Sequence, residues 1–213
     1  MYLFSRRARL SGANLREAAA WAIGVADLAT QTSGAPISVW SQVFSPEVGT
    51  LVWATFVPDL ATLEGINDKL AVDDAYNAEV ERGLPYVIPG SVDDGLGIIM
   101  NGDPDPNRSI EYVSSVRSTI GGGNLARGMA LGVEIAQRAE ALSGLPTLFL
   151  ADATGNYGGV SWITGYTDIA ELERAEMAIN GDPGFIELLD RNAGVFSDAP
   201  GASTQVIARR LSA

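Results

Sequence analysis

The strongest constraint in the sequence is that it aligns with itself at a shift of 110 residues. Short matching segments recur in the same order in both halves of the chain, and small gaps separate them. The matching pairs are 2–7 with 112–117, 12–15 with 122–125, 33–36 with 143–146, 53–55 with 162–164, 59–64 with 168–173, and 89–90 with 200–201. The sequence therefore predicts one structural unit in two copies, over 1–100 and 111–213. Asn, Asp, Pro and Gly dominate the segment 101–110, which is predicted to be a linker.

Both copies predict the same order of elements. Strands are expected at 2–10 and 111–120, 37–44 and 147–153, 50–57 and 160–167, and 93–100 and 203–211; helices are expected at 15–31 and 125–142, from Asp59 and Asp168, and at 74–82 and 183–191. Asn14 and Asn124 are expected to cap the first helix of each copy through their side chains. The second and third strands are joined by so few residues that they must form an antiparallel hairpin.

The order β-α-β-β-α-β is that of a ferredoxin-like unit, so the fold class is α+β. Helices cover only one face of such a sheet, and the other face must also be covered. Two ferredoxin-like βαββαβ repeats in one chain are therefore expected to pack their sheets together as a pseudo-twofold α/β barrel.

This order and the position of the hairpin resemble the dimeric α/β-barrel superfamily, fused in tandem as in NIPSNAP-type proteins. Antibiotic-biosynthesis monooxygenases belong to the same superfamily. The resemblance covers nearly the whole chain but rests on element order rather than on a diagnostic motif. It implies a cofactor-independent, monooxygenase-like oxidation of an aromatic or polyketide-like substrate.

Composition excludes several kinds of chemistry. The chain has no Cys and no His, so thiolate sites, His-ligated haem and His general bases are excluded. The net charge of −12 argues against nucleic acid as a partner, and no apolar stretch is long enough to span a membrane. Charges follow the apolar residues at the N-terminus, which is the wrong order for a secretory signal and predicts a cytoplasmic protein. The fused copies already supply the usual dimer contact, so we expect a monomer, or a homodimer that pairs through an outer helix face. We expect no metal and no cofactor, and a small organic molecule as the partner.

Strand alternation predicts which side chains face away from the helices. In the first strand the even positions are mostly apolar and are expected to pack under the helices, whereas Arg7 and Arg117 face the other sheet. The same alternation places Trp40, Gln42, Leu150 and Asp152 of the second strand, and Trp53, Thr55, Trp162, Thr164 and Tyr166 of the third strand, on that face.

These side chains suggest a pocket between the sheets. The predicted ligand-binding residues are Arg7, Arg117, Trp40, Gln42, Trp53 and Trp162, and the candidate catalytic residues are Arg117, Asp152 and Tyr166. The arginines would bind an anion, the tryptophans would stack on a ring, and Asp152 or Tyr166 would transfer a proton. In the structural alternative, the tryptophans fill a core and Arg117 pairs with Asp152. The protein is then a non-catalytic binding, accessory or structural protein.

The segment Gly121–Ala126, followed later by Asp152, imitates a dinucleotide-binding fingerprint. The corresponding turn of the first copy lacks these glycines, and the strand that ends at Asp152 enters a hairpin instead of a helix. A Rossmann unit requires parallel strands, so this interpretation is rejected.

Overall fold

The computed structural model describes residues 1–12, 14–46, 48–105 and 107–211, and it divides the chain into two compact units. The first unit comprises Met1–Leu96 and the C-terminal residues from Arg209, and the second comprises Gly97–Ala208. Strands β4 (Asp93–Asn101) and β8 (Thr204–Arg210) therefore contribute residues to both units. By this division the predicted linker at 101–110 lies in the second unit.

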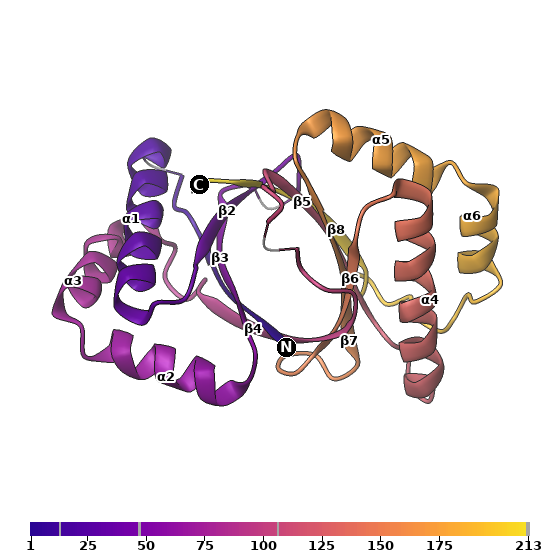
Figure 1. The fold of residues 1–213 in the computed structure, drawn as a ribbon, viewed down its shortest axis with the longest axis horizontal. Coiled ribbons are helices and arrows are strands. Elements are labelled where there is room, and N and C mark those ends of the chain that lie inside the picture. Colours follow the sequence, from indigo (N-terminus) through magenta and orange to yellow (C-terminus); the bar gives the residue numbers. More distant parts are fainter. Residues whose placement is uncertain (13, 47, 106, 212–213) are drawn as a thin grey trace. The chain divides into compact units, whose positions relative to one another are not determined.

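In the first unit, three helices cover one face of an antiparallel sheet (Figure 1). The elements are β1 (Tyr2–Arg9), α1 (Leu15–Ser33), β2 (Ser38–Val43), β3 (Thr50–Val57), α2 (Leu60–Ala71), α3 (Asp74–Arg82) and the short 3-10 helix η1 (Leu84–Tyr86). Strand β3 pairs with both β1 and β2, as expected for the predicted hairpin.

The second unit has the same order of elements. It contains β5 (Tyr112–Thr119), α4 (Leu125–Ser143), β6 (Thr147–Asp152), β7 (Gly159–Tyr166), α5 (Ile169–Asn180) and α6 (Pro183–Asp190). Strand β7 lies between β5 and β6, and β6 also pairs with the second half of β4. Antiparallel strands with helices on one face confirm the α+β class. The element boundaries lie within about two residues of those predicted from the sequence.

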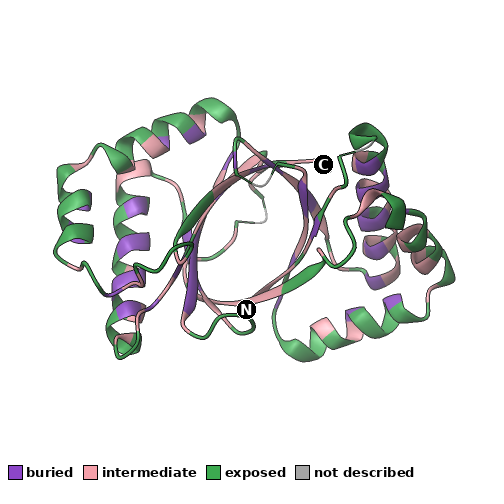
Figure 2. Cartoon of the chain, turned by 180° about the vertical axis from the view of Figure 1, so that it is seen from behind, coloured by how far each residue is buried: buried purple, intermediate pink, exposed green. Residues whose placement is uncertain are grey.

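Alanine-rich faces of α1 and α4 pack on the sheets. In α1 the buried positions recur at helical spacing and include Ala18, Ala22, Ala26 and Ala29. Small side chains let the helix lie close to the strands, and Figure 2 shows helices buried along one side and exposed along the other. Helix α1 ends at Gly34, where a positive φ of 79° lets the backbone N–H donate to the Thr30 carbonyl oxygen.

A tryptophan ties the sheet to the first helix in each unit. The indole N–H of Trp53 donates to the carbonyl oxygen of Ala22 (2.9 Å), and that of Trp162 donates to the carbonyl oxygen of Gly132 (2.8 Å). Each bond satisfies a polar group that would otherwise be buried without a partner.

The expected side-chain caps at Asn14 and Asn124 are wrong. Both residues precede their helices as predicted, but neither side chain accepts a capping hydrogen bond. Asn14 adopts a left-handed conformation (φ 54°), whereas side-chain capping needs extended backbone at this position. The Asn124 amide instead donates to the Gly194 carbonyl oxygen. Asp59 and Asp168 do cap α2 and α5, through the amides of Thr62 and Glu171.

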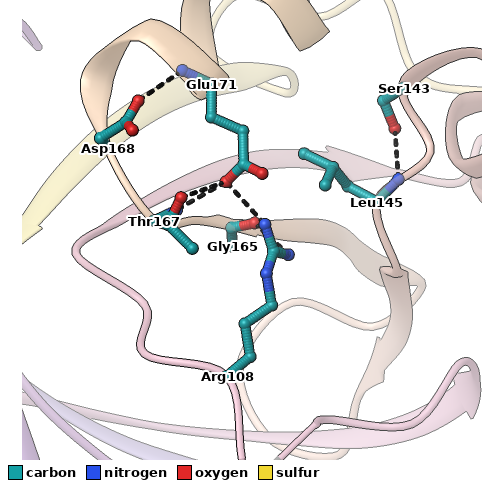
Figure 3. Close-up of polar contacts among 7 residues, drawn as sticks. All are labelled: Arg108, Ser143, Leu145, Gly165, Thr167, Asp168 and Glu171. Atoms are coloured by element: carbon teal, nitrogen blue, oxygen red, sulfur yellow. Dashed lines mark hydrogen bonds and ion pairs between the residues drawn. The ribbon is translucent and has the colours of Figure 1, made fainter.

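The segment that follows β4 is attached to the second unit by Arg108 (Figure 3). Its guanidinium donates to the Gly165 carbonyl oxygen (3.0 Å) and to Glu171 (2.6 Å). Burial alone would raise the pKa of Glu171, but hydrogen bonds from the Thr167 backbone and side chain, together with the charge of Arg108, lower it. The ionised Glu171 carboxylate therefore accepts hydrogen bonds from both Arg108 and Thr167 and holds the segment in place.

Among the helices of the described residues, none combines the length and apolar character required to cross a membrane.

Gly83 is predicted to be essential for the stability of the first unit. A Cβ atom at this position would lie 1.8 Å from Cε2 of Trp21, so Gly83→Ala should lower the free energy of unfolding by about 3 kcal/mol, measured by urea denaturation. Gly65→Ala is the control, because no atom lies within 4 Å of its Cβ and alanine favours the helix by about 1 kcal/mol. An unchanged urea midpoint for Gly83→Ala would contradict this packing.

Candidate functional site

The register of β3 decides which face its side chains occupy. Thr55 lies opposite Phe4, and Trp53 lies opposite Arg6. Directly opposed residues of an antiparallel pair point to the same side of a sheet. The even positions of β1 face the helices, as predicted, and Trp53 and Thr55 therefore face the helices too. The expectation that they point away from the helices is wrong.

The same correction applies to the second unit. Trp162 stacks on Phe149, with 5.4 Å between ring centroids, and its indole bonds to α4. Thr164 and Tyr166 share its face because they follow it at intervals of two residues. The sequence shows the alternation along each strand but not which residue of β5 faces which residue of β7.

The predicted polar residues form ion pairs inside each unit. Arg7 pairs with Asp93 (3.0 Å), and Arg117 lies 3.8 Å from Asp152. Burial raises the pKa of Asp152, and the charge of Arg117 partly opposes this rise. The Arg117–Asp152 contact is the one expected in the structural alternative.

Trp40 and Gln42 lie on β2. The Trp40 indole donates to the Ser38 hydroxyl (2.9 Å), and the Arg210 guanidinium lies 5.7 Å from the centre of the Trp40 ring. Gln42 is buried, and its Oε1 has no hydrogen-bond partner among the described residues. The ligand-binding roles of Arg7, Arg117, Trp40 and Gln42 stay predictions.

Tyr166 is fully buried. Its hydroxyl lies 2.9 Å from the Ser114 hydroxyl and donates to Glu176 (3.2 Å). Burial, and secondarily the Glu176 carboxylate, raise the pKa of Tyr166 to about 12, although hydrogen bonds with Ser114 and Thr164 partly lower it. The phenol is therefore protonated at neutral pH and is suited to filling the core rather than to proton transfer.

A cavity of about 180 Å³ lies within the first unit, between its helices and the β1–β3 face. Most of its wall is apolar and aromatic. The lining residues that carry the argument below are Phe4, Arg6, Trp21, Trp53, Thr55 and Tyr76. Leu84 and Val92 also line it and are exposed, so the cavity reaches the surface beside them.

Arg6 is the charged residue among those that line the cavity. Its guanidinium makes two hydrogen bonds of 2.7 Å to the Asp94 carboxylate. The Asp94 hydrogen bond raises the pKa of Arg6, burial opposes the rise, and the Asp94 charge and Tyr76 add to it. Arg6 and Tyr76 thus place a cation and a phenol hydroxyl on one part of the wall.

Sequence reasoning missed the cavity, although one signal pointed to it. Arg6 occupies an even position of β1, between Phe4 and Ala8, where the alternation predicts an apolar residue under the helices. A cation at such a position needs a partner or a polar site.

Thr55 is the second polar group of interest in the cavity wall. It is only 5% exposed, and its hydroxyl oxygen has no hydrogen-bond partner among the described residues. Asn67 of α2 lines the same cavity. Among the described residues, no cluster of three or more acidic side chains could hold a metal ion.

No family model matches this chain. No curated protein matches it either. Solved structures do match. A candidate monooxygenase from Fusobacterium nucleatum subsp. nucleatum ATCC 25586 has a TM-score of 0.72 at 7% identity, covering 99% of this chain and 92% of that one. An anthrone oxidase-like protein has a TM-score of 0.66 at 9% identity, covering 98% and 90%.

A NIPSNAP domain protein from Burkholderia xenovorans covers 49% of this chain and 100% of its own, at 20% identity and a TM-score of 0.42. The matches to the candidate monooxygenase and to the anthrone oxidase-like protein cover nearly the whole chain and show that it shares their fold. At such low identities the likeness extends to the fold alone.

Tyr166→Phe is predicted to remove the last phase of tyrosine ionisation, near pH 12, followed by absorbance of the phenolate. It should also cost about 1–2 kcal/mol of stability, because Ser114 and Glu176 lose a partner. The stabilisation from the raised pKa is complete below pH 10 and is lost as the pH rises from 10 to about 12. Tyr157→Phe, at a position 90% exposed, should leave the last phase in place. Survival of that phase in Tyr166→Phe would refute the assignment.

Proposed function

We propose that this protein binds a small, mostly apolar organic molecule in the cavity of its first unit. The observation that carries the proposal is a cavity of about 180 Å³ with an aromatic wall and few polar groups. Such a lining is typical of small-molecule sites, in which apolar contact supplies affinity and a few polar groups orient the ligand.

The volume suits a molecule built on one ring. An apolar cavity of about 150 Å³ binds benzene in another protein. Trp21 and Trp53 lie in the wall with their rings at 77° and their centroids 5.6 Å apart, and they offer flat and edge surfaces to a ring. The cavity therefore favours a single aromatic ring with small substituents.

The predicted pocket between the two sheets stays a prediction, together with the arrangement that it requires. We propose that the two units are ferredoxin-like repeats that form a pseudo-twofold α/β barrel. The shared order of elements and the equivalent tryptophan bonds support this arrangement.

The binding proposal is tested with toluene as the probe and tryptophan fluorescence as the readout, because Trp21 and Trp53 line the cavity. Ala29→Phe should fill the cavity from α1 and weaken toluene binding more than tenfold, while the melting temperature stays the same or rises. Toluene binding to this variant with wild-type affinity would refute the proposal, as would a wild-type protein that binds no toluene.

The matched control is Ala20→Phe. This residue lies on the exposed face of the same helix, so the identical substitution adds a ring that points to solvent. Toluene affinity should equal that of the wild type, which separates filling of the cavity from a general effect on α1.

A second candidate function is the cofactor-independent oxidation that the family resemblance implies. It is supported by Arg6 and Tyr76, which put an anion-stabilising cation and a proton donor on the wall. In the reaction an aromatic substrate loses two hydrogens and gains one oxygen atom of O₂ as a carbonyl. The other oxygen atom leaves as water, so no external reductant is needed.

Oxygen uptake with aromatic compounds that displace toluene tests this activity. Arg6→Met should lower the rate of uptake at least tenfold, because the anion loses its counter-charge, while toluene still binds. Equal uptake by the wild type and Arg6→Met would exclude this role for Arg6.

A further inference from the structure

A threonine occupies the same register position in both units, but its surroundings differ. Thr55 of β3 lies opposite Phe4, and Thr164 of β7 lies opposite Ser114. Both threonines are buried. A buried hydroxyl needs a hydrogen-bond partner, and leaving it without one costs free energy.

In the second unit, protein side chains supply the partners. The Thr164 hydroxyl lies 2.9 Å from the Thr147 hydroxyl, and Thr164 also interacts with the phenol of Tyr166. The aromatic ring of Tyr166 is fully buried, and its hydroxyl is bonded to Ser114 as well. The Thr147 hydroxyl thus satisfies Thr164, and the phenol of Tyr166 lies beside it on the same face of β7.

In the first unit, apolar residues take both places. Val57 corresponds to Tyr166, because each pairs with the first tyrosine of its neighbouring strand, Tyr2 or Tyr112. Ser38 pairs with Ala54, so the preceding Ile37 comes opposite Thr55, as Thr147 lies opposite Thr164. The positions that hold Tyr166 and Thr147 beside Thr164 therefore hold apolar residues beside Thr55.

The unpartnered hydroxyl and the cavity occur together. Thr55 lines the cavity, as do Ile37 and Phe4, and its oxygen has no partner among the described residues. A ligand hydroxyl inside the cavity would supply the missing bond.

We infer that the ligand is a single-ring phenol whose hydroxyl bonds to Thr55 Oγ1 while its ring fills the aromatic part of the cavity. This inference rests on the proposed function and names the chemical class of its ligand. The ligand's phenol hydroxyl would lie beside Thr55 as the hydroxyl of Tyr166 lies beside Thr164.

Other hydroxyl or acidic ligands fit less well. A carboxylate would carry a full negative charge beside a mostly apolar wall, and removing that charge from water costs free energy. A phenol is neutral at pH 7. A fused system of several rings exceeds a space only slightly larger than one that holds benzene.

The test compares 4-methylphenol with toluene, which has the same ring and methyl group but no hydroxyl. Isothermal titration of the wild type should give tighter binding of 4-methylphenol. Thr55→Val keeps the side-chain shape and removes the hydroxyl, so the preference for 4-methylphenol over toluene should fall about fivefold to tenfold. The variant should remain folded, because this hydroxyl has no protein partner to lose.

Three variants make the comparison specific. Thr164→Val removes the matching hydroxyl of the second unit and should leave the preference unchanged. Ile37→Thr offers Thr55 the partner that Thr147 gives Thr164 and should lower the preference, although both ligands still bind. Ala29→Phe should weaken binding of both ligands if they share this cavity.

The outcomes separate the two proposals. If the wild type binds both ligands equally, or if Thr55→Val keeps the wild-type preference, the phenol inference is overturned while binding in the cavity stands. If neither ligand binds the wild type, both proposals fail. An equal loss of preference in Thr164→Val would also overturn the assignment to Thr55.

Discussion

In both units a tryptophan of the third strand donates its indole N–H to a backbone carbonyl within the first helix. Trp53 bonds to Ala22 and Trp162 to Gly132. A helix carbonyl that already serves its own ladder accepts a second bond here, and the tryptophan ring lies between helix and sheet. The bond therefore fixes the distance and the rotation of the helix on the strands. Small residues along α1 and α4 are the consequence of that short distance.

This constraint also decides where the site lies. Because Trp53 faces α1, every second residue of β3 faces the helices as well, including Thr55. The opposing residues of β1 share that face, so Phe4 and the partly exposed Arg6 also lie on the helix side of the sheet. The cavity then forms where the side chains of this one face do not fill the space between sheet and helices.

The two units have the same order of elements but pack different side chains between the first helix and the sheet. In the second unit, Gly132 leaves room for the ring of Phe149, and Tyr166 is buried with its hydroxyl bonded on more than one side. In the first unit, valine stands at both of the corresponding strand positions, Val39 and Val57. The two units thus share their order of elements and the tryptophan bond, and they differ in the side chains around the buried threonine.

From the sequence alone one can predict the order of elements, the approximate positions of their ends, the α+β class, and that the even positions of β1 lie on the helix side of the sheet. These properties depend on local periodicity and on turn residues, which one chain displays directly. Only the tertiary structure decided the face of β3, because that face depends on which residue of β1 lies opposite Thr55, and register is a contact between distant segments. It also decided that Asn14 does not cap its helix, because a left-handed backbone there overrides the preference of the side chain. The cavity could not be predicted from the sequence either. A cavity remains where many packed side chains together fail to fill the space between helix and sheet, and no single residue of the sequence indicates this.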